Sequence, residues 1–496
     1  MSSRQSLSSP PGFTLPELSG VADDISTAGG DPTAIELTYY DTPDLRLARA
    51  GATLLYRGDE GWVVTLGRET TGGPEFTRDE HRFEGPAGQP PPGVVDLVRA
   101  LVRTARVTPV ARLRTRRRRV ELRDSSDKLI GEVLDDEVTV LASGRVAARF
   151  RELDVELDDA APEGLADALV SRLRSAGAGP PDPTPRIVRA LGWRALEPPD
   201  VTAVRRLGPS PSAGDAIRNA LAASVARLVA HDPGVRLGDD PEDVHQARVA
   251  TRRLRSDLRT FSDLLDPDWT QSLRHDLKSI GHDLGAVRDT EVLLDRLRAH
   301  AERLPARDQA AARKIIQRLL QRWDAARGDL RVALGSTRYR ELLDRLVDAA
   351  REPAFVPGAA DDRAADVLPP LVTKPWEELN AAVEELPDDP SDDALHQVRI
   401  RAKRCRYASE AVAPAVGKRA RSFAKAIADL QDVLGEHQDA VVAEQWLREV
   451  GAASTGAEVF VAGQLASLER VEVERTRGVW GDAWKAASKK KLRQWL

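Results

Sequence analysis

The fold of the C-terminal half is decided by a pattern that occurs twice, as VHQARVATRRLR at residues 244–255 and as LHQVRIRAKRCR at residues 395–406. Further along each copy, LGAVRD at residues 284–289 is matched by LGEHQD at residues 434–439. The offset between the copies is 151 residues for the first motif and 150 for the second. Internal periodicity of this kind is typical of a duplicated structural unit, so we predict two helical pseudo-repeats.

The first copy carries a cationic stripe. Its basic residues follow one another at intervals of 3, 4, 3 and 4, which places them on one face of a helix. They are His245, Arg248, Arg252, Arg255 and Arg259. A second, apolar stripe lies about 100° around the helix. It consists of Val244, Ala247, Leu254, Leu258 and Phe261. The pattern predicts a helix that packs on one side and presents cations on the adjacent side.

The second copy repeats this arrangement with a cationic stripe of His396, Arg399, Lys403 and Arg406. Like charges three and four residues apart on a helix repel by a few tenths of a kcal/mol per pair. Neither stripe contains an acid that would relieve this repulsion, apart from Glu410 at the end of the second stripe. Solvation, or acids on neighbouring helices, would explain one such helix. Two in matching register favour a shared groove for an external anion. Guanidinium groups bind phosphate oxygens bidentately, and histidine can donate to phosphate.

Composition narrows the class of anion. The formal net charge of the 496-residue chain is −5, so an anion site must be a local concentration of cations. Single-stranded nucleic acid usually requires aromatic platforms, and Tyr407 is the aromatic residue near a stripe. Double-stranded DNA favours a basic domain. A linear phosphate polymer needs only spaced cations and a groove. We therefore predict inorganic polyphosphate as the partner and do not expect nucleic acid.

The rest of the chain divides into a strand-rich part and a helical part. Strands separated by turns are expected near residues 35–40, 54–57, 62–66, 107–123, 128–141 and 150–157, with helices at 92–104 and 163–176. Prolines and glycines then mark a linker, and from residue 215 the apolar period is helical. We predict a multidomain α+β protein. An N-terminal antiparallel β-barrel or tunnel spans 1–197, a linker 198–213, and an all-α bundle of two pseudo-repeats 214–496.

The strand-rich part has charges on two predicted strands. Glu152, Asp154 and Glu156 share one strand face. They repel one another unless a hard cation such as Mg²⁺ or Mn²⁺, or a group of arginines, faces them. A solvent-facing strand is the alternative. Another strand carries Arg112, Arg114 and Arg116–Arg119, so both of its faces receive cations. This fits a barrel that holds a charged ligand, or ordinary pairing with acids on adjacent strands.

The two His-x-x-Arg helices and the two Leu-Gly-x-x-x-Asp segments resemble the CHAD family. Its members are compact helical bundles with two pseudo-symmetric halves, and the resemblance covers residue 215 to the C-terminus. It implies that inorganic polyphosphate binds along a basic surface, for which no cofactor is required. The residues carried over are His245, Arg248, Arg252, Arg255, His396, Arg399, Lys403 and Arg406, and Arg259 is a further candidate because it continues the first stripe. Rim candidates are Lys278, Lys425, Arg253 and Arg404.

Residues 1–195 resemble a CYTH domain of the triphosphate tunnel family. The resemblance rests on YYDTP at 39–43, the hairpin with Arg57 and Trp62, RDE at 78–80, and residues 112–119, 135–136 and 152–156. It implies an eight-stranded antiparallel tunnel. In active members, carboxylates hold Mg²⁺ or Mn²⁺, which polarises the phosphate of a triphosphate substrate for hydrolysis. A CYTH domain followed by a CHAD domain is a familiar order.

The chain departs from active CYTH members in its first strand. They carry Glu-x-Glu-x-Lys, where the aligned residues here are Ser2, Arg4 and Ser6. Leu55 and Thr65 stand at two further positions that usually carry an arginine and a lysine. We therefore expect an inactive domain. The remaining residues are Arg57 and Arg117 for residual anion binding, and Glu80, Asp136, Asp154 and Glu156 for a metal.

Two other functions stay open. One is a Mg²⁺- or Mn²⁺-dependent triphosphatase or polyphosphatase, in which the helical half recruits the substrate. The other is an interaction scaffold whose basic stripes are satisfied internally. The single cysteine, Cys405, excludes an intrachain disulfide and a cysteine-based zinc site. No apolar run reaches the roughly 18 residues of a membrane span. We expect a cytoplasmic protein without membrane contact, and the family resemblance implies a place at polyphosphate granules.

Overall fold

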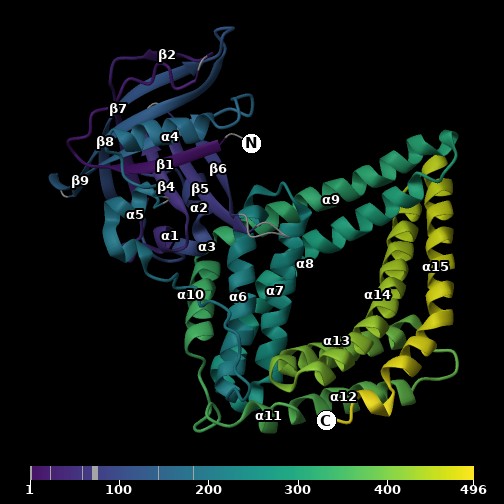
Figure 1. Ribbon diagram of the computed structural model, residues 1–496. Helices are drawn as coiled ribbons and strands as arrows, with labels where there is room; N and C mark the ends of the chain where they lie inside the picture. The colour runs from purple at the N-terminus through teal and green to yellow at the C-terminus, as the bar shows by residue number, and fades with distance from the viewer. Residues whose placement is uncertain (1–2, 23, 59, 70–75, 143, 183) are drawn as a thin grey trace. The chain divides into compact units, whose positions relative to one another are not determined.

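The computed structural model describes residues 3–22, 24–58, 60–69, 76–142, 144–182 and 184–496 (Figure 1). The chain divides into two compact units, residues 1–200 and residues 201–496. Each unit has its own core and is described by itself.

The first unit is built on an antiparallel sheet. Its strands are β1 (Ser3–Ser9), β2 (Ser26–Gly29), β3 (Thr33–Asp41), β4 (Thr53–Arg57), β5 (Gly61–Glu69), β6 (Phe76–Phe83), β7 (Thr108–Arg123), β8 (Leu129–Ala142) and β9 (Arg145–Leu157). They are ordered β1-β9-β8-β7-β3-β4-β5-β6, and β2 pairs with β7 beside this path. The antiparallel sheet followed by helices confirms the predicted fold class.

Both faces of the long strands are buried over part of their length. On one face, Leu122, Val133 and Val155 pack against Leu169 of α4 (Leu165–Ser175). On the other, which we call the inner face, apolar residues of β3, β4, β5, β7 and β8 pack against α5 (Arg186–Leu191). The short helix α5 therefore fills part of the space that the sheet curves around.

The helix predicted at residues 92–104 is interrupted. The structure has α2 (Pro92–Leu97) and α3 (Arg99–Val102), separated by Val98, whose φ of −98° and ψ of 9° depart from helical geometry. The segment ends at Arg103, which has a φ of 54° and a buried side chain paired with Asp200. The positive φ of Arg103 is incompatible with a right-handed helix, so the helical segment ends there. The remaining helical pieces of this unit are α1 (Arg46–Arg49) and the 3₁₀ turn η1 (Gly192–Leu196).

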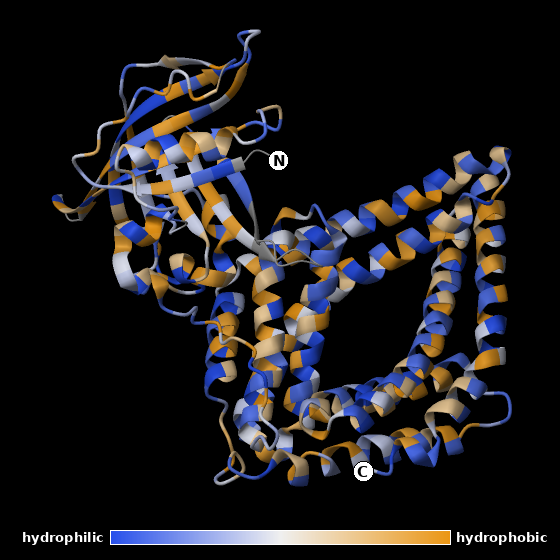
Figure 2. Ribbon diagram, in the orientation of Figure 1, coloured by the Kyte–Doolittle hydropathy of each residue, from blue (hydrophilic) through white to orange (hydrophobic). Residues whose placement is uncertain are grey.

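The second unit is helical. Its α-helices are α6 (Ala213–Leu237), α7 (Pro241–Thr260), α8 (Pro267–Ala301), α9 (Gln309–Gly335), α10 (Thr337–Arg351), α11 (Ala364–Val367), α12 (Pro370–Glu384), α13 (Asp392–Val416), α14 (Lys418–Ala452) and α15 (Ala457–Ala487). Apolar and polar residues alternate along these helices at helical spacing (Figure 2). Among the residues described, no helix combines the length and hydropathy needed to cross a bilayer.

The duplicated motifs lie on equivalent helix pairs. In the first copy the basic motif is on α7 and the Leu-Gly motif on α8, and in the second copy they are on α13 and α14. Each basic helix begins at an N-cap whose side chain accepts from the backbone, Asp240 for α7 and Ser391 for α13. The helices of each pair contact each other, and α7 also contacts α13 (Figure 1). The two basic helices therefore meet in one place.

Candidate functional site

The cationic stripes of the two copies converge between α7 and α13. Burial lowers the pKa of Lys403 to about 7, and the positive charges of Arg252, Arg399 and Arg248 act in the same direction. Burial also lowers the pKa of Arg252, which lies within the electrostatic reach of Arg248, Arg406 and Arg399. These five residues, Arg248, Arg252, Arg399, Lys403 and Arg406, form what we call the cation cluster.

The aromatic ring of Tyr407 contacts arginines in and beside the cation cluster. Tyr407 is buried on α13, and the guanidinium carbon of Arg252 lies 5.4 Å from its ring centre. Arg253 and Arg406 lie 5.7 and 5.8 Å from the same centre. Cations are attracted to the ring face at such distances. Because three guanidinium groups surround this ring, it is not a free platform for a nucleobase.

The Leu-Gly-x-x-x-Asp motifs hold arginines of the cluster. A β-carbon on Gly285 would lie 3.9 Å from Nε of Arg248, and one on Gly435 would lie 3.7 Å from Nε of Arg399. Each glycine thus lies directly beside an arginine, with room for a methyl group at ordinary contact distance. Four residues after Gly285, Asp289 forms an ion pair with Arg248 at an N–O distance of 2.8 Å. Sequence reasoning identified this motif but gave it no role.

The aspartate of the second copy is more deeply enclosed. Burial raises the pKa of Asp439, and the charge of Arg399 opposes that rise. Asp439 follows Gly435 by four residues, as Asp289 follows Gly285. Each pseudo-repeat therefore places one carboxylate beside one arginine of the cluster.

Several buried polar atoms in the cation cluster and elsewhere on α13 lack a partner. Among the described residues, Nε of Arg252, Nε of Arg399, Nδ1 of His396 and the Tyr407 hydroxyl make no hydrogen bond. Leaving a buried donor unpaired costs about 1–3 kcal/mol. Arg252 and Arg399 lie within electrostatic reach of each other, so the cation cluster holds two buried N–H donors that an anion with several oxygens could satisfy.

The other predicted anion-binding residues fall into two groups. Burial lowers the pKa of Arg259, and the charges of Arg404, Arg274 and Arg255 add to this, which places these four side chains near one another toward the C-terminal end of α7. Sequence reasoning missed Arg274, since it lies on α8 outside either motif. At the other end, burial and the charge of Arg288 lower the pKa of His245.

Some predicted cations have internal partners. Arg406 donates to Glu410 at 2.7 Å, and Arg253 pairs with Glu410 and with Asp257. Glu410 is the acid that the sequence placed at the end of the second stripe, whereas Arg253 and Asp257 lie beside the stripe of α7 and not within it. Of the rim candidates, Lys425 lies 3.5 Å from Asp429, and Lys278 is exposed on α8.

In the first unit, carboxylates on the inner face of the sheet are bonded to arginines. Asp136 accepts two hydrogen bonds from Arg117, both at 2.8 Å, and one from Arg186 of α5 at 2.7 Å. Arg186 also donates to Glu152 at 2.6 Å. Burial alone would raise the pKa of Asp136, but the two guanidinium groups hold it below its ordinary value.

The first strand supplies another arginine. Arg4 donates to Asp154 at 2.8 Å and lies 3.1 Å from Glu156, and the Ser6 hydroxyl also donates to Asp154. This follows from the register, in which Ser6 pairs with Asp154 and Arg4 with Glu156. Ser2 lies outside the described residues. Cations from the chain itself therefore face the acids that the sequence suggested as metal ligands.

The two remaining inner-face candidates are also paired. Glu80 accepts from Arg82, which lies two residues away on β6. Arg57, the other expected anion-binding residue, pairs with Glu60. Sequence reasoning missed Arg4 and Arg186 as partners, since neither belongs to a recognisable motif.

Family comparison assigns both units. Residues 11–184 match the CYTH domain and residues 219–448 match the CHAD domain. The chain contains a CYTH domain followed by a CHAD domain. This confirms the resemblance that the sequence motifs suggested.

Two similar proteins match nearly the whole chain, and two similar solved structures match about half of it. Two uncharacterized proteins of Mycobacterium tuberculosis, from strains CDC 1551 and H37Rv, are each 29% identical over 486 residues, which is 93% of this chain and 91% of theirs. PptA from Streptomyces chartreusis is 27% identical and covers 56% of this chain and 100% of its own, with a TM-score of 0.46. The CHAD domain from the plant Ricinus communis is 26% identical and covers 56% and 95%, with a TM-score of 0.45.

The residues of the CYTH inner face do not fit a hard metal cation. Mg²⁺ and Mn²⁺ need several carboxylate oxygens that are free to coordinate. Here the oxygens of Asp136 and Asp154 are already hydrogen-bonded to arginines. Within the described part of the chain, no group of three potential ligands could hold a metal. Leu55 packs in the apolar cluster beside Ile187 and Val188 of α5, so the middle of the inner face is hydrophobic.

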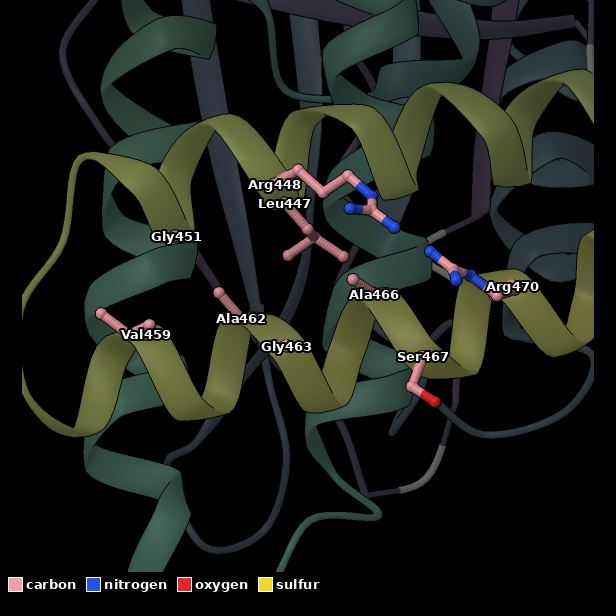
Figure 3. Close-up of a pocket in the computed structure, with 9 residues that line it drawn as sticks. All are labelled: Leu447, Arg448, Gly451, Val459, Ala462, Gly463, Ala466, Ser467 and Arg470. Atoms are coloured by element: carbon pink, nitrogen blue, oxygen red, sulfur yellow. The ribbon is translucent and has the colours of Figure 1, made fainter.

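The CHAD domain also has a pocket of about 340 Å³ between α14 and α15 (Figure 3). Small residues such as Gly451, Ala462 and Gly463 line it, with Arg448 and Arg470 at one end. Both arginines donate to Glu444. The lining includes no residue of the cation cluster, and its charged groups are already paired.

Proposed function

We propose that the CHAD domain of this protein binds inorganic polyphosphate through the cation cluster between α7 and α13. The observation that carries this proposal is the convergence of cations from both pseudo-repeats around Lys403. Among the described residues, Arg252, Arg399 and Lys403 have no ion-pair partner within 4.0 Å, and Nε of Arg252 and Arg399 is buried without a hydrogen bond. A phosphate chain would supply the missing charge and acceptors together.

The length of the stripe favours a polymer over a compact phosphate. From His245 to Arg259 the helix rises ~21 Å, at 1.5 Å per residue. Arg255, Arg259, Arg274 and Arg404 extend the cluster toward one end, and His245 extends it toward the other. An extended polyanion can contact all of these groups, whereas one phosphate ion reaches only a few.

Inorganic chains fit better than nucleic acid. Bases need exposed aromatic rings on which to stack. Tyr407 is the ring at the cluster, and it is buried beneath Arg252, Arg253 and Arg406. The site therefore offers charge along a line without a stacking platform.

For the CYTH domain, this proposal includes no hydrolysis. Catalysis in this fold family would require carboxylates that hold a metal, which polarises the phosphate. The arginine pairs of Asp136, Asp154 and Glu152 support a domain in which internal guanidinium groups take the place of both metal and substrate.

The test measures binding and hydrolysis together on the full-length chain. Labelled long-chain polyphosphate is titrated over a salt series, and phosphate release is followed with and without Mg²⁺ or Mn²⁺. We expect salt-sensitive binding with no release. Arg252→Glu with Lys403→Glu should weaken binding roughly 100-fold, because two phosphate contacts are lost and repulsion is added.

The matched control is Arg322→Glu with Arg331→Glu on α9, which changes the net charge equally at exposed positions away from the cluster. It should bind almost as the wild type does. Metal-dependent phosphate release would instead establish the hydrolase function. Absence of binding at low salt would leave the scaffold function.

A further inference from the structure

The CYTH domain carries an arginine row that neither the cation cluster nor the inner face uses. Arg112, Arg114, Arg116 and Arg118 alternate with inward residues along β7, and all four are exposed. The side chains of Arg112, Arg114 and Arg116 are 54%, 60% and 68% exposed. We call the surface on which they lie the outer face.

Register adds a fifth arginine to this row. Arg114 pairs with Thr139 on β8, and Thr139 pairs with Arg149 on β9. These three residues therefore lie in one line across the sheet and on the same face. Arg149 is exposed as well. Toward the other end of β7, the same face is covered by the apolar cluster of Leu122, Val133 and α4, so the basic part is bounded.

Nearby acids do not match this charge. The Glu36 carboxylate is shared between Arg112 at 2.6 Å and Arg114 at 2.8 Å. Glu137 lies 3.9 Å from Arg116 but closer, at 3.4 Å, to Arg151. Two exposed carboxylates, those of Glu36 and Glu137, are thus the acids near five exposed arginines, so the negative charge does not balance the positive charge.

Two members of the row have no partner at all within the described residues. Neither Arg118 nor Arg149 makes an ion pair or a side-chain hydrogen bond there. Asp135 stands opposite Arg118 in the register, but it is 3% exposed and bonded to Arg151 through both oxygens. The excess positive charge therefore remains available to an external anion.

We propose that this outer face, made of Arg112, Arg114, Arg116, Arg118 and Arg149, is a second binding surface for a linear inorganic polyanion. Alternate residues of a strand lie ~7 Å apart, so the row extends ~20 Å in a straight line. The adjacent outward positions Ala34, Thr38 and Thr139 carry no ring for a nucleobase, and Tyr56, next in line beyond Thr38, is half-buried with its ring against Trp62. The identity of the ligand as polyphosphate rests on the proposed function of the CHAD domain.

The test uses the full-length chain with the cation cluster disabled by Arg252→Glu and Lys403→Glu. In this background, Arg118→Glu with Arg149→Glu is compared with Arg172→Glu and Arg174→Glu, two exposed arginines on α4. Both pairs change the net charge equally. We expect residual polyphosphate binding that falls roughly tenfold with the outer-face pair and remains with the α4 pair.

The same outer-face pair in an otherwise wild-type chain should lower the slope of log affinity against log salt by roughly 1.4, about 0.7 for each lost contact on a single-stranded polyanion. Equal effects of the two pairs would overturn the proposal, because net charge alone would then act. Tighter binding of a single-stranded RNA of equal charge would overturn the choice of an inorganic chain. If the cluster variants leave binding unchanged while the outer-face pair removes it, the CHAD proposal fails and this one stands.

Discussion

The Arg252 guanidinium lies 5.4 Å from the ring centre of Tyr407, and the two residues come from different halves of the duplicated CHAD domain. Arg252 is on α7 and Tyr407 on α13. The contact joins the two basic helices within the cation cluster. It also supports a guanidinium that has no ion pair of its own within the described residues.

Replacing Tyr407 tests this support. Tyr407→Leu should weaken polyphosphate binding roughly 2- to 30-fold, since a cation–π contact contributes about 0.5–2 kcal/mol. Tyr407→Phe keeps the ring and removes a hydroxyl that is buried without a partner. It should therefore bind as the wild type does and melt at the same or a higher temperature. A loss of binding in the Phe variant equal to that in the Leu variant would exclude the ring as the support.

The lowered pKa of Lys403 leads us to predict that polyphosphate binding depends on pH. Its pKa of about 7 in the free protein lies below its ordinary value, so ligand-free Lys403 is increasingly neutral above pH 7. A bound anion favours the ammonium form, so binding takes up a proton. Polyphosphate affinity should then fall between pH 7 and pH 9, by at most about tenfold per pH unit for one proton.

Lys403→Arg is the control for this effect, because arginine stays charged throughout. The affinity of that variant should change little over the same range. For the ligand-free protein the sign is opposite. The unfolded chain holds the Lys403 proton above pH 7 while the folded chain releases it, so this group makes the fold more stable as pH rises. An equal pH dependence in both proteins would remove Lys403 as the cause.

Gly435 predicts a steric effect on Arg399. A methyl group at this position lies 3.7 Å from Nε of Arg399, which is an ordinary contact. Gly435→Ala should therefore keep polyphosphate affinity and stabilise α14 by about 0.5–1 kcal/mol, since glycine is unfavourable within a helix. Gly435→Leu must displace the guanidinium, and it should weaken binding several-fold while the protein stays folded by circular dichroism. Unchanged affinity in the Leu variant would show that Arg399 does not contact the anion.

We expect the ion pairs of Arg186 to stabilise the CYTH domain. Arg186→Leu removes a partner of both Asp136 and Glu152, and breaking a buried ion pair costs about 3–5 kcal/mol. The thermal transition of this domain should move to a clearly lower temperature. Arg118→Leu, at an exposed position without a described partner, should change stability by less than about 0.5 kcal/mol.

The ion pair between Arg186 and Asp136 also makes the stability of the CYTH domain depend on pH. The pKa of Asp136 is held below its ordinary value, so its contribution to stability is present above the pKa of the unfolded chain and is lost as pH falls through the folded value. The difference between wild type and Arg186→Leu should therefore narrow below about pH 4. A constant difference down to pH 2 would contradict the assignment of these charges.

The sequence predicted which residues of the cation cluster share a helix face, because that information is local. Spacings of three and four residues fix which side chains share a helix face, and the 151-residue offset revealed the second copy of the stripe. The roles of Gly285 and Gly435 were not predictable, since they depend on how closely α8 approaches α7 and α14 approaches α13. Asp289 was missed as a partner of Arg248 for the same reason.

In the CYTH domain, alternation placed Asp154 and Glu156 on the same strand face, and the structure has both beside Arg4. What faces these acids could not be read from one strand. The sequence left a metal, a group of arginines and solvent open as alternatives, and the pairing of β1 with β9 brings in Arg4. Packing of α5 brings in Arg186, on a six-residue helix that no motif marks.

The central claim is that the two pseudo-repeats form one anion site, and a double-mutant cycle between Arg252 and Lys403 tests it most directly. Polyphosphate affinity is measured for the wild type, Arg252→Ala, Lys403→Ala and the double variant at one salt concentration. In this account both side chains contact the same anion, and the positive charge of Arg252 lowers the pKa of Lys403. We therefore predict a coupling free energy of at least about 1 kcal/mol. Additive losses, within about 0.5 kcal/mol, would show that the two helices bind separately and would contradict the shared site.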